Sequence, residues 1–130
     1  MRTREDIEAY FLRTGLGYEE VAPNTWVLRD PSFGENIVVR VDSDLVVFRM
    51  KVLALEGVTR KQALFEKLLE LNANEMLQGA YGIADGAVVI TDTLRLENVD
   101  YNEFQATLDD FTMALSKHFE TLSTFRDAAA

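Results

Sequence analysis

The stretch Leu68–Gly82, LLELNANEMLQGAYG, joins a leucine-rich helical pattern to a pattern typical of a β-strand. Leu68 and Leu71 continue an apolar stripe at helical spacing that ends near Asn72. The stretch contains no obvious nucleophile, general base or metal ligand. It therefore predicts a helix-to-strand junction, which is a feature of the fold rather than of a catalytic site.

Three segments of the chain show a helix start followed by apolar residues at helical spacing. The predicted N-caps, each with its partner three residues later, are Thr3 with Asp6, Thr59 with Gln62, and Asp100 with Glu103. The apolar stripes are Ile7, Tyr10 and Phe11 in the first helix, Leu64, Phe65, Leu68, Leu69 and Leu71 in the second, and Phe104, Leu108, Phe111, Leu115, Phe119 and Leu122 in the third. The third helix is predicted to be long and amphipathic.

The segments between these helices alternate apolar and polar residues, which is typical of β-strands. They are a strand at residues 24–30, a hairpin at 35–52 that bends at Asp42-Ser43-Asp44, and a hairpin at 79–96 that turns at Asp85-Gly86. A further turn is expected from Pro31 to Gly34.

The predicted order is helix, three strands, helix, two strands, helix. No linker, repeat or low-complexity tract interrupts it, so we expect residues 1–126 to form a single domain and 127–130 to form a loose C-terminal tail. The fold class is α+β, with an antiparallel sheet packed against the helices.

The composition limits which type of protein this chain can be and which partners it can have. Of the 130 residues, 48% are apolar and 27% are charged, as in an ordinary soluble domain. The chain has no cysteine, which fits a reducing cytoplasm, and its first helix is too charged for a signal peptide or membrane span. The formal net charge of −9 opposes attraction to nucleic acid or anionic lipid. We therefore expect a cytoplasmic protein with no nucleic-acid or membrane partner.

Four features resemble sites of chemistry, and each has a simpler interpretation. The single histidine, His118, lies inside the third helix and is expected to flank its apolar stripe. Asp42-Ser43-Asp44 lacks the rest of a calcium loop and is typical of a turn. Gly15-Leu16-Gly17 follows a helix, whereas a dinucleotide-binding loop precedes one. Asp109 and Asp110 are adjacent on a helix and point in different directions. We expect no catalytic residue, no metal site and no cofactor.

One further pattern concerns the two faces of the predicted sheet. The alternation predicts which residues of these strands pack under the helices: Trp26, Leu28, Ile37, Val39, Val41, Val46, Phe48, Met50 and Val52. The opposite face then carries valines and cations, with Val27, Arg29, Val38, Arg40, Val47, Arg49 and Lys51 as the candidate partner-binding residues.

Two interpretations of this face stay open. The simpler one is that strands often combine exposed arginines with branched side chains, without any partner. The functional one is a docking face for an acidic or amphipathic segment, because arginine and apolar residues are enriched in interface cores. The second interpretation requires that the arginines be exposed on neighbouring strands.

The segment Leu68–Phe111, LLELNANEMLQGAYGIADGAVVITDTLRLENVDYNEFQATLDDF, resembles the YbjN family of small bacterial proteins. The shared pattern is a leucine-rich helix ending in Asn72, the pair Gly79-Ala80 before a short hairpin, and a leucine-containing segment before the last helix. The resemblance implies a fold similar to that of type III secretion chaperones, including the Tir chaperone. Those are small, acidic, usually dimeric proteins that hold an extended segment of a client.

The resemblance implies a non-enzymatic, chaperone-like or regulatory protein-binding module. Its expected partners are a protein or peptide client and a second copy in a homodimer. An alternative from another class is a small-ligand sensor or enzyme with a pocket between the sheet and the last helix. Such a pocket would need a convergent polar cluster, whereas the predicted helix stripes are almost wholly apolar.

Overall fold

A computed structural model describes residues 2–29 and 36–126, and confirms the α+β class. Its helices are α1 (Arg4–Thr14), α2 (Lys61–Asn74), the 3-10 turn η1 (Leu96–Asn98) and α3 (Tyr101–Ser123). Its strands are β1 (Gly17–Ala22), β2 (Thr25–Arg29), β3 (Asn36–Asp42), β4 (Leu45–Ala54), β5 (Ala80–Ala84) and β6 (Ala87–Arg95). The turn expected at 31–34 and the tail expected at 127–130 lie outside the described residues.

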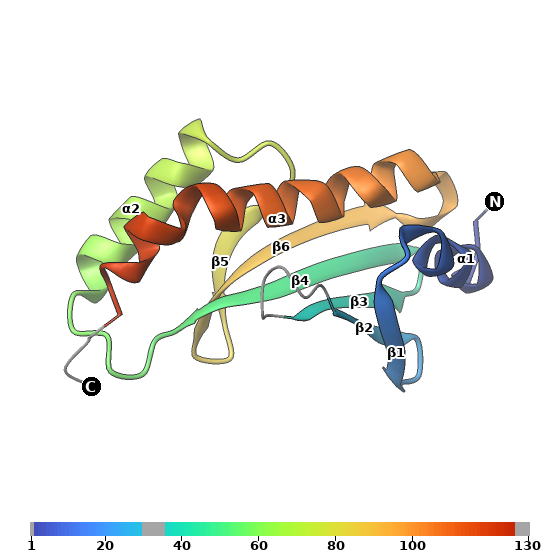
Figure 1. Ribbon diagram of the computed structural model, residues 1–130, viewed down its shortest axis with the longest axis horizontal. Helices are drawn as coiled ribbons and strands as arrows, with labels where there is room; N and C mark the ends of the chain where they lie inside the picture. The colour runs from blue at the N-terminus through green and yellow to red at the C-terminus, as the bar shows by residue number, and fades with distance from the viewer. Residues whose placement is uncertain (1, 30–35, 127–130) are drawn as a thin grey trace.

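The strands form one sheet in the order β1-β2-β3-β4-β6-β5, with every neighbouring pair antiparallel (Figure 1). The two expected hairpins are β3–β4 and β5–β6. Their turns place Ser43, Asp85 and Gly86 at positive φ, the backbone conformation that such tight turns require. The central pairing of β4 with β6 spans α2, so it joins segments that are far apart in the sequence.

The structure has four strands before α2, whereas the sequence pattern predicted three. The additional strand, β1, is an edge strand whose residues are almost all exposed, so it has no apolar alternation to reveal it. The sequence does contain a turn signal directly after this strand, at Pro23 and Asn24, and Asn24 adopts a φ of 59°.

Two of the three predicted helix starts are confirmed. The carboxylate of Asp6 accepts the backbone N–H of Thr3 at 2.8 Å, and Asp100 accepts the backbone N–H of Glu103 at 2.8 Å. The predicted cap at Thr59 is wrong, because α2 begins at Lys61 and no side chain caps it. Instead, the backbone N–H of Leu64 donates a hydrogen bond to the carbonyl oxygen of Arg60.

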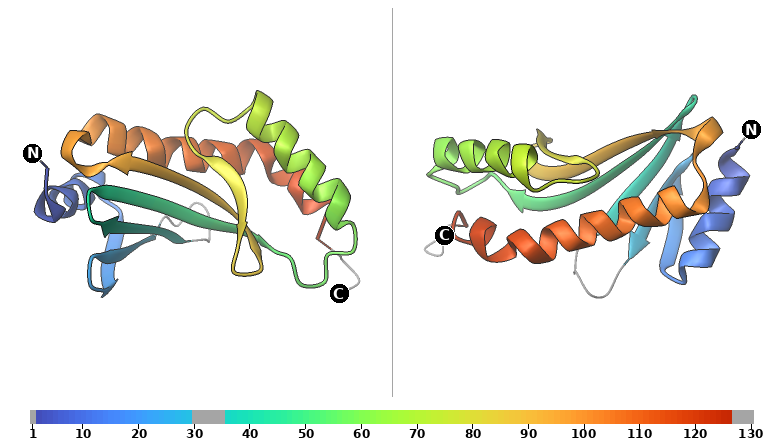
Figure 2. Two further views of the ribbon diagram at one scale, coloured as in Figure 1. Left: turned by 180° about the vertical axis from the view of Figure 1, so that it is seen from behind. Right: turned by 90° about the horizontal axis from the view of Figure 1, so that it is seen from above.

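α3 runs along the sheet, with α1 beside its first turns and α2 beside its last turns (Figures 1 and 2). Aromatic side chains fill the space beneath it: the rings of Phe48 and Phe104 lie 5.4 Å apart, and those of Phe11 and Trp26 lie 5.3 Å apart. The sheet residues expected under the helices are buried, except that Val41 is only partly covered. Among the described elements, none of the helices covers the opposite face of β2, β3 and β4 (Figure 2).

Candidate functional site

The candidate residues of β2, β3 and β4 all lie on the outer face of the sheet, opposite α3. Val27 pairs with Val38 across β2 and β3, and Val38 pairs in turn with Arg49 on β4. Arg40 pairs with Val47 in the neighbouring row. The expected juxtaposition of valines and cations on adjacent strands is thus present.

The exposure of these side chains follows their chemistry. All four cations, Arg29, Arg40, Arg49 and Lys51, are exposed. Val38 is 36% exposed, while Val27 and Val47 are partly buried between the longer side chains. The face therefore presents partly exposed valines between exposed cationic side chains, which is the arrangement that the docking interpretation requires.

Carboxylates compensate part of this positive charge. Arg29 Nη2 lies 3.4 Å from Glu19 Oε1, and Arg40 Nη2 lies 3.8 Å from Asp42 Oδ2. Both pairs are more than half exposed to water, so each contributes little to stability and is easily exchanged for another partner. A carboxylate on a docking segment could therefore take the place of either partner.

A hollow of about 320 Å³ lies at one end of this outer face. Val38, Arg49 and Lys51 line it, together with Asp85, Val89 and two alanines from the β5–β6 hairpin. Val89 is only 5% exposed, so it forms an apolar floor, while Arg49 and Lys51 are exposed cations above it. The geometry suits an apolar side chain that has a carboxylate nearby.

Sequence reasoning missed Asp85 and Val89 as parts of this site. Lys51 lies opposite Val89 because β4 pairs with β6, and no local pattern predicts that pairing across α2. The only available signal was the apolar run Ala87–Ile90, which has buried residues on both faces of the sheet.

His118 is buried, with 4% exposure, and its Nδ1 lies 2.7 Å from the hydroxyl oxygen of Tyr81. The expectation that it flanks the stripe of α3 is therefore correct, and it packs against β5. Burial lowers the pKa of His118 and raises that of Tyr81, so both groups are neutral near pH 7. This pair links α3 to the sheet.

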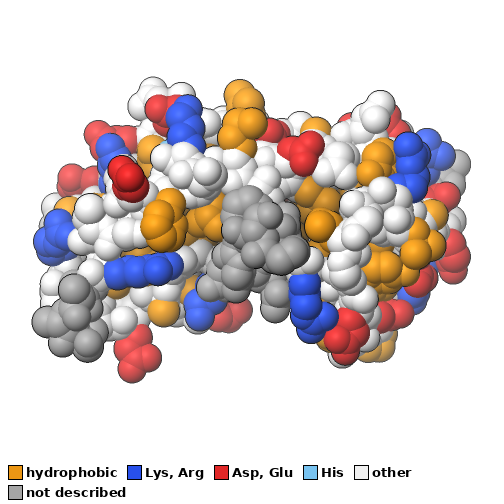
Figure 3. All heavy atoms as spheres, viewed as in Figure 1, with side chains coloured by type: hydrophobic (Ala, Val, Ile, Leu, Met, Phe, Trp, Pro, Cys, Tyr) orange, Lys and Arg blue, Asp and Glu red, His pale blue; other side chains and the backbone are white. Residues whose placement is uncertain are grey.

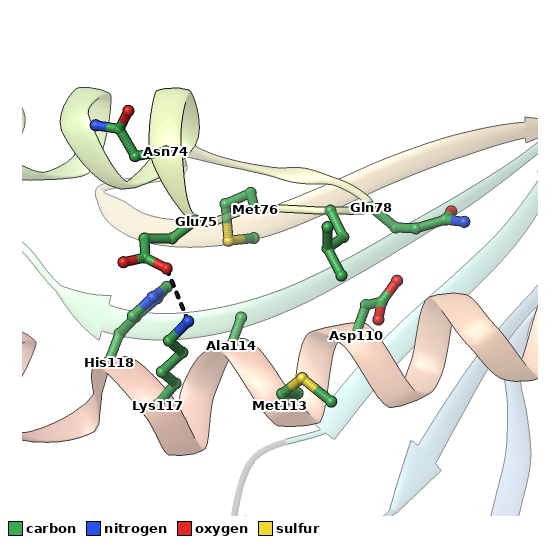
Figure 4. A pocket seen from close by; sticks show the side chains of 10 residues that line it. Asn74, Glu75, Met76, Gln78, Asp110, Met113, Ala114, Lys117 and His118 are labelled. Carbon is green, nitrogen blue, oxygen red and sulfur yellow. Dashed lines mark hydrogen bonds and ion pairs between the residues drawn. The ribbon is translucent and has the colours of Figure 1, made fainter.

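A second hollow, of about 230 Å³, lies where the connection between α2 and β5 faces α3 (Figure 4). Glu75 and Lys117 form an ion pair of 2.7 Å across it, and this contact lowers the pKa of Glu75. Its lining mixes these groups with Met76, Met113 and the partly buried Asp110. The ligand-sensor alternative placed a pocket between the sheet and α3, whereas this hollow opens beside α3.

Metal-binding clusters and membrane-spanning helices are both absent from the described residues. Within residues 2–29 and 36–126, no group of three histidine or carboxylate side chains is arranged to hold a metal ion. Over the same ranges, none of the helices combines the length and the hydropathy needed to cross a bilayer.

Comparisons with solved structures give the fold. The chain is similar to one in the ExsC–ExsE complex, with a TM-score of 0.72, 12% identity, and coverage of 98% of this chain and 99% of that one. It is similar to one in the heterodimeric ExoU–SpcU complex from the type III secretion system of Pseudomonas aeruginosa, with a TM-score of 0.68, 17% identity, and coverage of 93% and 98%. For YbjN from E. coli the TM-score is 0.66 at 11% identity, with coverage of 93% and 96%.

The likeness to YbjN confirms the resemblance indicated by Leu68–Phe111. Among curated proteins, none matches the sequence. The family model CesT_Tir_1, by contrast, matches residues 1–128, which is nearly the whole chain. The protein therefore belongs to the type III chaperone family that CesT_Tir_1 describes.

Proposed function

We propose that this protein is a chaperone-like module that binds a segment of another protein on the outer face of its sheet, and that it is not an enzyme. The observation that carries the proposal is the pairing of Val27, Val38 and Arg49 in one row across β2, β3 and β4. Family membership supports a chaperone-like role. The ExsC–ExsE and ExoU–SpcU structures, which share the fold, are complexes of two proteins.

Charge supports the choice of this face. The chain carries a net charge of −9, yet four exposed cations gather around the valines of β2, β3 and β4. A segment with apolar and acidic residues would bury Val38 and pair with Arg49 or Lys51, so it would be attracted to this face and repelled by most of the remaining surface.

The binding segment would be extended. Side chains on a sheet surface repeat along and across strands, so an extended chain can place alternate residues over the valines. β1 offers an additional mode, because it is an exposed edge strand to which a client could add a strand. We expect the module to act in the cytoplasm as a homodimer.

A small-ligand function has less support. The hollow beside α3, at about 230 Å³, is below the range of roughly 300 to 1,000 Å³ that is usual for sites of drug-sized ligands. The outer-face hollow is larger, but its rim of flexible cations and its position on an open sheet fit a protein segment better.

The decisive experiment is a capture from source-cell lysate with matched variants. The intact protein is compared with the double variant Arg40→Glu, Arg49→Glu and with Lys61→Glu, which places the same kind of charge change on an exposed position of α2. We expect a partner that the intact protein and Lys61→Glu both retain, and that the double variant loses although it remains folded by circular dichroism.

Two results would contradict the proposal. A partner retained by all three proteins would keep the binding role but remove it from the outer face. Repeated failure of the intact protein to enrich any partner would remove the binding role itself, and thermal-shift screening with metabolites would then be the next test.

A further inference from the structure

We propose that the hollow between the α2–β5 connection and α3 is a second protein-docking site, which takes one apolar side chain of a partner segment with a lysine or arginine beside it. The site is separate from the outer face of the sheet, and its occupant has the opposite charge. The inference therefore stands or falls independently of the function proposed for the outer face.

The shape of the hollow comes from one stripe of α3 and one turn of connecting chain. Met113 and Ala114 lie three and four residues after Asp110, and Lys117 lies four and three residues after them, so the four residues share one side of α3. The opposite wall is the chain that leaves α2, with Met76 pointing toward the helix (Figure 4). The hollow is therefore a short groove between two backbones.

The rim of this groove is apolar and unusually exposed. Leu77 is 84% exposed and Met113 is 58% exposed, although both line the hollow. Hydrophobic side chains are visible between charged ones on the face that α3 presents (Figure 3). Methionine side chains adapt to differently shaped partners and are enriched in interface cores, so this rim suits an inserted side chain.

The volume of the groove favours a single side chain over a whole small-molecule ligand as its occupant. A volume of about 230 Å³ is less than the roughly 300 to 1,000 Å³ of usual small-molecule sites. One leucine, methionine or phenylalanine side chain is the kind of group that it can bury. The backbone of the partner would remain outside, against Leu77 and Met113.

Charge then determines what accompanies that side chain. At one end, Glu75 is neutralised by Lys117 at 2.7 Å. At the other end, among the described residues, Asp110 has no ion-pair partner. Burial and then the neighbouring Asp109 raise the pKa of Asp110. The end of the groove at Asp110 is therefore negative and lacks a cation.

The sheet behind α3 adds to this negative potential. Asp92, on β6, is partly buried, and its Oδ2 has no hydrogen-bond partner among the described residues. Its pKa is raised by burial and also by the charge of Asp110. A lysine or arginine next to the inserted side chain would approach Asp110 and stabilise it and Asp92 in their charged form.

The test uses short synthetic peptides in a Gly/Ser background that carry one leucine and one lysine. Matched peptides replace the lysine by glutamate or the leucine by glycine. Titration of the isotope-labelled protein, followed by backbone amide NMR, should move the signals of Leu77 and Met113. We expect the leucine–lysine peptide to bind about fivefold more tightly than the leucine–glutamate peptide, as for one exposed charge pair.

Two variants locate the charge preference. Asp110→Lys should reverse the order of the lysine and glutamate peptides. Glu56→Lys makes the same charge change at an exposed position in the chain before α2, and should leave the order unchanged. Equal binding of all peptides, or amide shifts that avoid Leu77 and Met113, would overturn the proposal.

A second copy of the chain is the competing occupant. Leu77→Ser alters a side chain that is 84% exposed, so this variant is expected to fold. Sedimentation of the intact protein as a dimer, with Leu77→Ser as a monomer, would show that a second copy covers the groove and would overturn the proposal. An unchanged sedimentation coefficient together with loss of peptide binding would support it.

Discussion

Tyr81 and His118 meet in the core, where the hydroxyl oxygen of Tyr81 lies 2.7 Å from Nδ1 of His118 and joins β5 to α3. Burial raises the pKa of Tyr81 and lowers that of His118, so a neutral hydroxyl meets a neutral imidazole, and either group can supply the hydrogen of this bond. The other ring nitrogen, Nε2, is buried and has no hydrogen-bond partner among the described residues. The single histidine of the chain therefore has a structural role.

Removing the hydroxyl should destabilise the fold. Tyr81→Phe leaves Nδ1 of a buried imidazole without a hydrogen-bond partner, so we expect the free energy of unfolding to fall by about 1–2 kcal/mol. Tyr18→Phe is the matched control, because no hydrogen bond from the Tyr18 hydroxyl is present among the described residues, and its effect should stay within about 0.5 kcal/mol. Urea unfolding measures both changes, and equal losses would contradict the structural role.

The same contact makes stability depend on pH. Burial lowers the pKa of His118 in the folded protein, despite the opposing charge of Glu75, whereas the unfolded chain has the ordinary value of about 6.5. As the pH falls below about 6.5, the unfolded state takes up the proton first, so the free energy of unfolding decreases until the pH reaches the folded pKa. Above about pH 7 this contribution is fully present.

The measurement compares urea unfolding of the intact protein and of His118→Gln between about pH 7 and pH 5. We expect the difference in stability between them to shrink toward pH 5, because only the intact protein titrates at this position. NMR of the single imidazole should give a pKa below 6.5 directly. A value at or above 6.5 would contradict the burial argument.

The sequence predicts those parts of the fold that depend on local contacts. The hairpins around Ser43 and Asp85-Gly86 follow from alternation and from turn residues that tolerate positive φ. The capping box of Asp100 follows from spacing alone. Each of these features is determined within a few residues, so no knowledge of the remaining chain is needed.

The parts that the sequence does not predict depend on distant contacts. The order of the sheet brings Val89 opposite Lys51, which extends the outer-face site beyond the three strands from which it was inferred. The helical spacing of apolar residues also does not show which edge of a broad apolar stripe packs against the core. Leu69 and Phe119 belong to the predicted stripes, yet they are 68% and 52% exposed.

Asn72 explains why the helix-to-strand junction is distinctive. β5 is an edge strand, and the side chain of Asn72 takes the place of a missing neighbouring strand: its Oδ1 accepts the N–H of Tyr81 at 2.7 Å, and its Nδ2 donates to the carbonyl of Tyr81 at 3.1 Å. Each bond satisfies a main-chain group that the sheet leaves unpaired.

Asn72→Ala should therefore lower the free energy of unfolding by about 2 kcal/mol, at about 1 kcal/mol for each lost bond. Asn74→Ala is a close control, since it makes the same exchange on α2 but loses only one exposed bond to the carbonyl of Glu70, and should change stability by about 0.5 kcal/mol or less. Thermal or urea unfolding distinguishes them. Similar losses would mean that the link from Asn72 to β5 contributes no more to stability than an exposed side-chain bond within α2.

Gly79 supplies the last constraint on the junction, because it combines a φ of +77° with a close approach to the sheet. An added Cβ would lie 2.8 Å from the carbonyl oxygen of Thr91 and 3.0 Å from Phe111 Cε1. Gly15 has nearly the same φ, +74°, but nothing lies within 4 Å of its Cβ position. The two glycines therefore separate backbone strain from steric clash.

Gly15→Ala should reduce the free energy of unfolding by about 1–2 kcal/mol, the cost of a left-handed alanine. Gly79→Ala has the same cost and must also move the backbone of β6 or the ring of Phe111, which adds about 1–3 kcal/mol. Urea unfolding of the two variants in parallel measures the difference. If they lose the same stability, the junction can shift away from β6, and the close packing of residue 79 on the sheet would not be a requirement of this fold.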